Sequence, residues 1–393
     1  MEKAVIVDAI RTPMGRGKST GALASVHPVD LLSQVLKQLV ERTGIDPGQV
    51  DDVLVGCVSQ VGEQSGTPGR FAWLGAGFPA HVPSTTIERK CGSGQQAIEF
   101  ANQAIMAGAY RMCVAAGVES MSRVPMGSGR IGQDPFGPTV HERLPGLVPQ
   151  GVAAELIAAR WGISREQQDE YAATSHRRAA ATAASGRFDA EIVPIVTSDG
   201  SKVTRDETIR ADTTAERLGG LRTAFDSDEF RARFPDLAWS VTAGNSSQIT
   251  DGASALLLME EGLAAELGLR PRARIVASAV IGDDPELMLT GPIPATRKIL
   301  ARSGLTLDDM DAIELNEAFA SVPLAWQSEC GVPAEKLNPR GGAIALGHPL
   351  GASGCRLMTT LINELEATGG RYGLQTMCEA GGMANATIIE RLG

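Results

Sequence analysis

Short apolar runs alternate with amphipathic stretches along most of the chain. Residues 5–7 and 53–55 are continuous apolar runs, as expected of strands that are buried on both faces. Between them, apolar residues recur at helical spacing, at Leu31, Leu32, Val35, Leu36, Leu39 and Val40. This β-α-β rhythm predicts an α/β fold with parallel strands covered by helices.

The C-terminal third repeats the rhythm with the same spacing. Each copy has three landmarks: a strand residue, a helix start made of small residues, and a residue of the next strand. The first two landmarks are 38 positions apart and the last two are 23 positions apart. They are Val53, Cys91 and Val114 in the first copy, and Ile313, Gly351 and Leu374 in the second. We interpret this as an internal duplication of one β/α unit.

The middle of the chain does not follow the rhythm. It is rich in glycine, proline and charge, with helix patterns at 153–161 and 165–184 whose polar positions are typical of solvated faces. Long excursions of this kind usually carry binding function. We therefore expect an N-terminal half (1–121 plus 249–270), an inserted loop domain (122–248) and a C-terminal half (271–393).

Composition excludes several classes of protein. The chain has 393 residues, 43% of them hydrophobic and 21% charged, with a net charge of −10, which argues against nucleic acid as a partner. No apolar run is long enough to span a bilayer, and the N-terminus leads directly into a strand without a visible signal peptide. The six cysteines show neither disulfide nor zinc spacing, so we expect no metal and a reducing, cytoplasmic setting.

Cys91 stands where an extended run gives way to a helix-like run, within the sequence Cys91-Gly92-Ser93-Gly94. Backbone N–H groups and the helix dipole at such a position stabilise a thiolate. The glycines are expected to leave room for an acyl group near the sulfur. A catalytic nucleophile and an ordinary buried cysteine remain about equally good readings of this residue alone.

Three further segments fall where loops are expected at the carboxyl edge of the sheet. Asn316 directly follows a strand pattern, His348 precedes a glycine-rich helix start, and Cys378 ends a strand pattern. Taken singly, each has an ordinary structural explanation: a turn residue, a loop histidine and a core cysteine. The glycine-rich segment after His348 lacks the spacing of a phosphate-binding loop.

Together these segments resemble the thiolase family over essentially the whole chain. The motifs are C-G-S-G at Cys91, N-E-A-F-A at Asn316, G-H-P-L-G-A-S-G around His348 and C-E-A-G-G at Cys378. The resemblance implies two duplicated βαβαβαββ halves that form a layered α/β/α/β/α core with an inserted loop domain. It also implies an acyltransferase that uses coenzyme A as a substrate and needs no cofactor.

The resemblance implies a role for each of these four residues. Cys91 is the nucleophile that attacks a 3-ketoacyl-CoA, and His348 takes its proton. Cys378 protonates the departing acetyl-CoA enolate, and Asn316 holds a water that supports one oxyanion. The backbone N–H groups of Cys91 and Ala380 support the other oxyanion. Many thiolases have glycine at the position of Ala380, which would strain this loop if a positive φ were required.

The resemblance also suggests contacts to coenzyme A, at Ser247, Arg222, Ala243, Met288 and Phe319. The sequence Pro149-Gln150-Gly151 lacks the His-Met pair that is typical of acetoacetyl-specific thiolases. We therefore expect a degradative enzyme that cleaves 3-ketoacyl-CoA to acetyl-CoA, or propionyl-CoA, and a shortened acyl-CoA. The physiological direction and the acyl group stay open.

The sequence leaves alternatives to this interpretation. One is an acetoacetyl-CoA thiolase that runs in the condensing direction. Another is a non-catalytic acyl-CoA or lipid binder on the same fold, although all four reactive residues are present. A ketoacyl synthase is disfavoured because Cys378 stands where such enzymes carry a histidine. The family implies a homodimer or homotetramer, with 127–137 as a candidate assembly loop.

Overall fold

The protein is described here from a computed structural model that covers residues 3–393, so the expected domain start at Met1 and Glu2 lies outside the described residues. The N-terminal half contains β1 (Ala4–Arg11), β2 (Gly15–Arg16), α1 (Pro28–Thr43), η1 (Pro47–Gln49), β3 (Asp52–Gly56), η2 (Gly62–Gln64), α2 (Pro68–Gly75), β4 (Ser84–Ile87), α3 (Ser93–Met106), β5 (Met112–Ser120), β8 (Thr250–Glu260) and α9 (Glu261–Glu266).

The C-terminal half contains β9 (Ala273–Gly282), α10 (Pro292–Ser303), β10 (Met310–Leu315), α11 (Ser321–Cys330), η4 (Ala334–Lys336), α12 (Ala343–Leu346), α13 (Leu350–Thr368), β11 (Tyr372–Glu379) and β12 (Met383–Arg391). Between β5 and β8 lie η3 (Ser128–Arg130), α4 (Pro138–Arg143), α5 (Gln150–Arg160), α6 (Arg165–Ala184), β6 (Ile195–Val196), β7 (Lys202–Val203), α7 (Ala215–Gly219) and α8 (Asp228–Arg233).

Local sequence explains where the main helices begin and end. In α1, proline occupies the first turn, the His27 side chain accepts a hydrogen bond from the backbone N–H of Val29, and Gly44 ends the helix in the left-handed conformation. Helix α6 begins with a capping box between Ser164 and Gln167. Its length, Arg165–Ala184, is the one expected from the sequence.

Strand register confirms the duplication. Val53 pairs in parallel with Val114 in the N-terminal half, and Ile313 pairs in parallel with Leu374 in the C-terminal half. These are the same landmarks that the spacing had matched. Among the described residues the main sheet has the strand order β10-β11-β12-β9-β1-β8-β5-β3-β4, with β2 beside β8. The two halves meet where β1 pairs with β9 over only two residue pairs.

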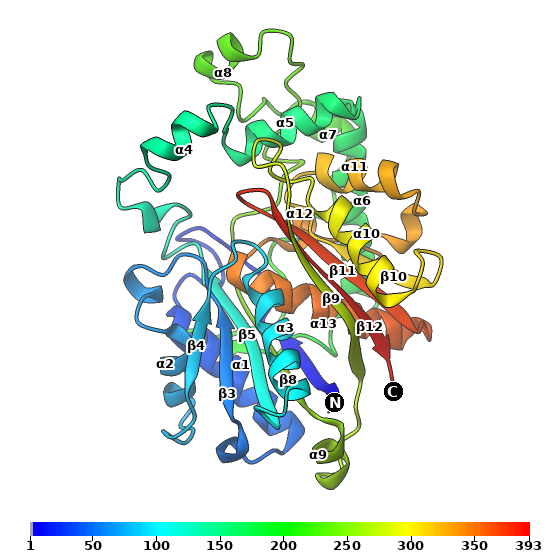
Figure 1. Cartoon of the computed structure of the whole chain (residues 1–393). Helices are drawn as coiled ribbons and strands as arrows, with labels where there is room; N and C mark the ends of the chain where they lie inside the picture. The colour runs from blue at the N-terminus through cyan, green and yellow to red at the C-terminus, as the bar shows by residue number, and fades with distance from the viewer. Residues whose placement is uncertain (1–2) are drawn as a thin grey trace.

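The layers follow from which residues each half buries. Helices α3 and α13 pack against each other between the strands of the two halves (Figure 1). Helix α1 covers the outer face of the N-terminal strands, and α10 and α11 cover that of the C-terminal strands. Because α13 is enclosed on all sides, its residues from Leu350 to Leu365 are all buried. The layered α/β fold expected from the sequence is confirmed.

The segment between β5 and β8 lies across the top of both halves in Figure 1. Its helix α6 is anchored at Glu317, whose carboxylate accepts hydrogen bonds from Tyr171 at 3.0 Å and Ser175 at 2.7 Å. The expectation of a solvated polar face on α6 is therefore wrong at four of its polar residues, which are all buried: Gln168, Asp169, Ser175 and His176. Polar residues on a helix usually face water, but here such residues form hydrogen bonds with the core.

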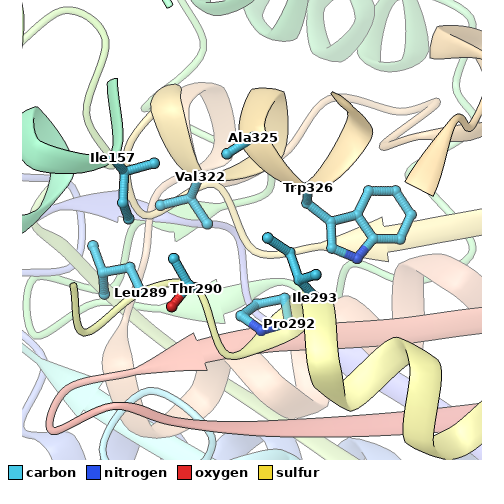
Figure 2. Close-up of a pocket in the computed structure, with 8 residues that line it drawn as sticks. All are labelled: Ile157, Leu289, Thr290, Pro292, Ile293, Val322, Ala325 and Trp326. Atoms are coloured by element: carbon cyan, nitrogen blue, oxygen red, sulfur yellow. The ribbon is translucent and has the colours of Figure 1, made fainter. Parts of the chain in front are cut away.

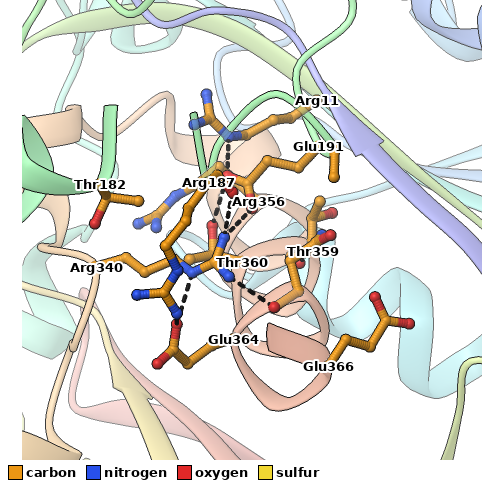
Figure 3. A network of polar contacts seen from close by, with 12 residues as sticks. Arg11, Thr182, Arg187, Glu191, Arg340, Arg356, Thr359, Thr360, Glu364 and Glu366 are labelled. Carbon is orange, nitrogen blue, oxygen red and sulfur yellow. Dashed lines mark hydrogen bonds and ion pairs between the residues drawn. The ribbon is translucent and has the colours of Figure 1, made fainter. Parts of the chain in front are cut away.

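A buried ionic network ties the same segment to the core (Figure 3). Arg11 of β1 donates to Glu191 at 2.7 Å and to Asp206 at 2.7 Å. Arg340 donates to Glu364 of α13 at 2.7 Å. Burial of these charges is tolerated because they are paired and hydrogen-bonded. The division of the chain at residues 121, 248 and 270 stays a prediction.

Candidate active site

The turn that carries Cys91 is held in a strained backbone conformation. Lys90, immediately before it, has φ 48°, which non-glycine residues rarely adopt. Ser93, the first residue of α3, donates from Oγ to the Lys90 carbonyl at 2.6 Å and accepts from the Arg89 N–H at 2.9 Å. These bonds fix the turn, so Cys91 sits directly before the helix start, as expected. Its side chain is only 5% exposed.

His348 lies between α12 and α13, with its ring held by the following helix. Its Nδ1 is 2.6 Å from Ser353 Oγ, and that hydroxyl also lies 2.8 Å from the carbonyl oxygen of Pro349, to which it can donate. A hydroxyl has one proton, so Ser353 accepts from Nδ1–H when it donates to Pro349. This tautomer leaves Nε2 as a proton acceptor.

Asn316 shares the free side of this ring. Its Nδ2 donates to His348 Nε2 across 3.4 Å, which is a long hydrogen bond. Its buried Oδ1 has no hydrogen-bond partner among residues 3–393. Burial, together with the charge of Arg356, lowers the pKa of His348 to about 3. The imidazole is therefore neutral near pH 7 and can accept a proton.

The two cysteines lie close enough to influence each other. Burial raises the pKa of Cys378 well above its ordinary value, and the neighbouring Cys91 contributes to the shift. Burial also raises the pKa of Cys91 to about 12, with a further contribution from Glu379. Both thiols are protonated at rest. The expected stabilisation of a Cys91 thiolate by the helix start is thus outweighed in the resting protein, and a base is needed to form it.

The backbone around Cys91 has the expected pair of donors. The N–H groups of Cys91 and Ala380 lie near the Cys91 sulfur and act to lower its pKa, against the larger effect of burial. The φ of Ala380 is not positive, whereas Gly381 and Gly382 have φ 91° and 75°. Alanine at position 380 therefore fits the loop without the strain considered from the sequence.

The glycines beside Cys91 have a different role from the one expected. A Cβ on Gly92 would lie 1.8 Å from Oε1 of Glu379, and a Cβ on Gly94 would lie 2.7 Å from the carbonyl oxygen of Gly351. The space beside them is filled by the C-terminal half. At these two positions glycine permits close packing of the halves rather than room for an acyl group.

Glu119, near the end of β5, is a site residue that the sequence analysis missed. Its buried carboxylate accepts hydrogen bonds from the backbone N–H groups of Val58, Ser59 and Gly351 at 2.9–3.0 Å, and from Gln64 at 2.9 Å. Gly351 lies in the first turn of α13, the helix that follows His348, so Glu119 joins the two halves at the site. No local motif marks a glutamate in a strand for such a role.

The structure brings most of the expected coenzyme A residues to one region. Ser247 donates its backbone N–H to Ala318 at 2.9 Å, next to Phe319. Phe319 and Met288 belong to one apolar cluster. Ala243 and Arg222 are both exposed and lie beside the Thr223–Thr242 bridge. Arg222 makes no hydrogen bond or ion pair among the described residues, so its expected role has the least structural support.

A narrow apolar pocket, without room for a water molecule, lies within this cluster (Figure 2). It lies between α5, α10 and α11 and is lined by residues that include Ile157, Leu289, Ile293 and Trp326. Met288, directly before Leu289, has φ 56°. Within residues 3–393 no group of three or more histidine, cysteine, aspartate or glutamate side chains is placed to hold a metal ion. Across the same residues, none of the helices combines the length and the apolar character needed to cross a bilayer.

Comparison with known proteins agrees with this geometry. Residues 4–262 match the family described as "Thiolase, N-terminal domain", and residues 269–391 match "Thiolase, C-terminal domain". The chain belongs to the thiolase family. The resemblance inferred from its motifs is thereby confirmed, as is the expectation of an acyltransferase.

Several thiolases resemble this chain closely. It is 47% identical to the steroid 3-ketoacyl-CoA thiolase FadA6 of Mycobacterium tuberculosis, covering 100% of this chain and 95% of that one. It is 45% identical to the 3-ketoacyl-CoA thiolase of Photobacterium profundum over the full length of both. The crystal structure of the Bacillus anthracis acetyl-CoA acetyltransferase superposes with a TM-score of 0.88 at 41% identity, covering 100% and 99% of the two chains.

Proposed function

We propose that this thiolase cleaves 3-ketoacyl-CoA with coenzyme A, giving acetyl-CoA, or propionyl-CoA, and a shortened acyl-CoA. The observations that carry the proposal are two neutral thiols that lie close to each other and a neutral histidine locked as a proton acceptor. Leu350, two residues after that histidine, packs in the same apolar cluster as Cys91. One thiol can become a nucleophile, and the other can supply a proton. A reversible carbon–carbon cleavage through an acyl-enzyme needs both.

In the proposed reaction, His348 Nε2 takes the proton of Cys91 and the thiolate attacks C3 of the substrate. The bond between C2 and C3 then breaks, and its electron pair leaves on the acetyl-CoA enolate. Cys378 protonates that carbanion at C2. Coenzyme A finally gives its thiol proton to the Cys378 thiolate and attacks the acyl-cysteine thioester. The shortened acyl-CoA leaves, and Cys91 recovers its proton from His348.

The oxyanions are assigned to two sets of donors. The N–H groups of Cys91 and Ala380 lie beside the sulfur, where the oxygen of the acyl-cysteine would develop charge. His348 and Asn316 lie in contact with each other, and a water held by Asn316 would serve the second thioester oxygen. Each such donor is worth about 3 kcal/mol in the transition state.

Coenzyme A is proposed as a substrate, with no further cofactor. Ser247, Ala243, Met288 and Phe319 are proposed to contact it, because they gather beside one apolar cluster. Arg222 is proposed for the adenine end on the basis of its exposed position alone.

We further propose that the acyl group is long, branched or ring-bearing. The relatives named 3-ketoacyl-CoA thiolase, at 45–47% identity, include a steroid thiolase, whereas the acetyl-CoA acetyltransferase is 41% identical. The test compares kcat/KM for acetoacetyl-CoA with that for a long-chain and a ring-bearing 3-ketoacyl-CoA. Preference for the larger substrates supports the proposal. A strong preference for acetoacetyl-CoA favours the condensing alternative.

A non-catalytic acyl-CoA binder is the alternative from another class. Incubation with a 3-ketoacyl-CoA in the absence of free coenzyme A should leave an acyl group on Cys91, detectable by mass spectrometry of the intact protein and its peptides. A protein that binds the substrate but never becomes acylated at Cys91 would support the binder instead.

We propose a homodimer or homotetramer in the cytoplasm. Phe71 and Leu74 of α2 are 55% and 37% exposed, beside the edge strand β4. Ile131 and Phe136 are 74% and 48% exposed on the segment expected to assist assembly, 127–137. Light scattering of the purified protein and of an Ile131→Glu variant tests this; a monomeric wild-type protein would contradict it.

A further inference from the structure

Glu379 lies against the turn that carries Cys91, although it belongs to the other half of the molecule. It follows Cys378 at the end of β11, and its Oε1 occupies the space where a side chain on Gly92 would begin. The residue is 0% exposed. Neither carboxyl oxygen has a hydrogen-bond partner among residues 3–393. A buried carboxyl group without partners is costly, and most so when it is charged.

The groups around Glu379 come from three elements. The Cys91 turn contributes Glu88 and Arg89, and α3 contributes Glu99. Strand β12 contributes only uncharged side chains at this point: Asn385, whose Oδ1 is unpaired, and Thr387, which donates to Glu99 Oε1 at 3.0 Å. Glu379 thus has one cation and two further carboxyl groups near it, besides the thiols of Cys91 and Cys378.

These surroundings favour the protonated form. Burial raises the pKa of Glu379 to about 9; Arg89 opposes the shift, and Glu99 and Glu88 add to it. Burial also raises the pKa of Glu99 to about 7. At neutral pH the Glu379 carboxyl is therefore uncharged, which suits a group without partners.

The N-terminal half provides an internal reference. Glu119 and Glu379 are separated by 260 positions (379 − 119), as are Cys91 and Gly351 (351 − 91). Glu119 accepts four hydrogen bonds, three from its own half and one from the N–H of Gly351 at the helix start of the opposite half. Glu379 meets the other helix start at Gly92 and accepts none. The same position in the duplicated fold is an anchor in one half and an unpaired acid in the other.

We propose that Glu379 is a positioning residue for Cys91. While its carboxyl group is uncharged, it packs against the turn that carries Cys91 and allows the Cys91 thiolate to form. Once the carboxyl group of Glu379 is ionised, its charge disfavours that thiolate. The proposal rests on Cys91 being the nucleophile. When Glu379 loses its proton to solvent, its negative charge lies beside the thiolate and beside the oxyanion that the Cys91 and Ala380 N–H groups serve. Both anions are then disfavoured.

The proposal predicts a bend in the pH dependence of thiol reactivity. The rate at which Cys91 is alkylated should rise tenfold per pH unit while only the thiol ionises. Above about pH 9 the rise should flatten, because each thiolate then forms next to a carboxylate. In a Glu379→Gln variant the rise should continue. Near pH 10, where about nine-tenths of Glu379 is ionised, the variant should react about fivefold faster than the wild type if the coupling is one pKa unit.

The experiment measures alkylation of Cys91 by iodoacetamide between about pH 7 and pH 10, a range that includes the carboxyl pKa and approaches the thiol pKa. The labelled peptide is quantified by mass spectrometry in the wild type and in Glu379→Gln, Glu379→Asp and Glu99→Gln variants. Glu379→Asp should keep the bend because it keeps the acid. Glu99→Gln, which removes the other buried carboxyl without touching Gly92, should also keep it.

Two results would overturn the proposal. One is a wild-type alkylation rate that rises without a bend up to pH 10; this measurement does not depend on whether any variant folds. The other is a Glu379→Gln profile shifted by the same factor at every pH, as a merely structural role would give. Failure of the proposed function is seen separately: if complete alkylation of Cys91 leaves turnover intact, Cys91 is not the nucleophile.

Discussion

The two halves of this thiolase place a glutamate at the same point of the fold, and the two carboxyl groups have opposite surroundings. Glu119 accepts four hydrogen bonds and holds the start of α13. Glu379 accepts no hydrogen bond and packs against the turn before α3. Duplication reproduces the placement of a side chain, but the partners that face it decide whether it stabilises the fold or acts on the chemistry.

The helix starts differ in the same way. The N-terminal half carries Cys91 before its central helix, whereas the equivalent position in the C-terminal half is Gly351, whose N–H is already used by Glu119. The C-terminal half supplies instead His348 and Cys378. Neither half holds all the groups that the proposed reaction requires, so the site forms only where α3 and α13 pack together.

The largest expected effect concerns the helix starts. Cys91→Ala should lower turnover at least about a thousandfold, as loss of a covalent nucleophile does. Thiolysis of a 3-ketoacyl-CoA, followed through loss of the substrate, measures it. Cys330→Ser, at the end of α11 and away from the site, should keep wild-type turnover. If the turnover of Cys91→Ala stayed within tenfold of the wild-type value, the N-terminal half would not supply the nucleophile, and the two helix starts would not differ in the way described.

The next effect compares the two glutamates by stability. Glu119→Gln places an amide among N–H donors and should lower the free energy of unfolding by about 3 kcal/mol. At neutral pH, Glu379→Gln should instead raise the free energy of unfolding. The folded pKa of Glu379, about 9, lies above the unfolded value of about 4.3, so the wild type loses stability as the pH rises between them and the variant does not.

Urea unfolding at about pH 5 and pH 8 measures both variants. From the lower to the higher pH, the free energy of unfolding of Glu379→Gln should rise by about 1–3 kcal/mol relative to that of the wild type. Glu335→Gln, which changes an exposed carboxylate, serves as the control. Equal losses of stability in Glu119→Gln and Glu379→Gln, unchanged by pH, would mean that both glutamates are simple anchors.

A smaller effect is expected at the histidine of the C-terminal half. Ser353→Ala removes the acceptor that selects the Nδ1–H tautomer of His348 and should lower kcat about tenfold, the equivalent of one hydrogen bond of about 1.4 kcal/mol. Ser353→Thr keeps the hydroxyl and should recover part of the rate. An unchanged kcat in Ser353→Ala would show that Asn316 alone orients the ring.

The smallest effect is expected at Ala380. Because its φ is not positive, Ala380→Gly should change turnover by no more than about twofold and should lower stability by about 0.5–1 kcal/mol through the added chain entropy. Steady-state kinetics and thermal unfolding measure the two quantities. A large gain in turnover would reveal strain in the loop that carries the oxyanion N–H.

Much of this site was already determined by the sequence. The spacing of apolar runs predicted the duplicated α/β fold, and the motifs at Cys91, Asn316, His348 and Cys378 indicated the thiolase family. These features are local, since strand and helix periodicity and short motifs are carried by consecutive residues. The length of α6 was equally readable from its pattern, Arg165–Ala184.

Only the tertiary structure decided what surrounds those residues. The hydrogen bond from Gly351 to Glu119 joins residues 232 positions apart, and Glu379 meets Gly92 across the two halves. Ser175 looked like a surface residue until the fold brought Glu317 to it. A side chain's charge state depends on its burial and its partners, and both are set by packing between distant segments rather than by neighbours along the chain.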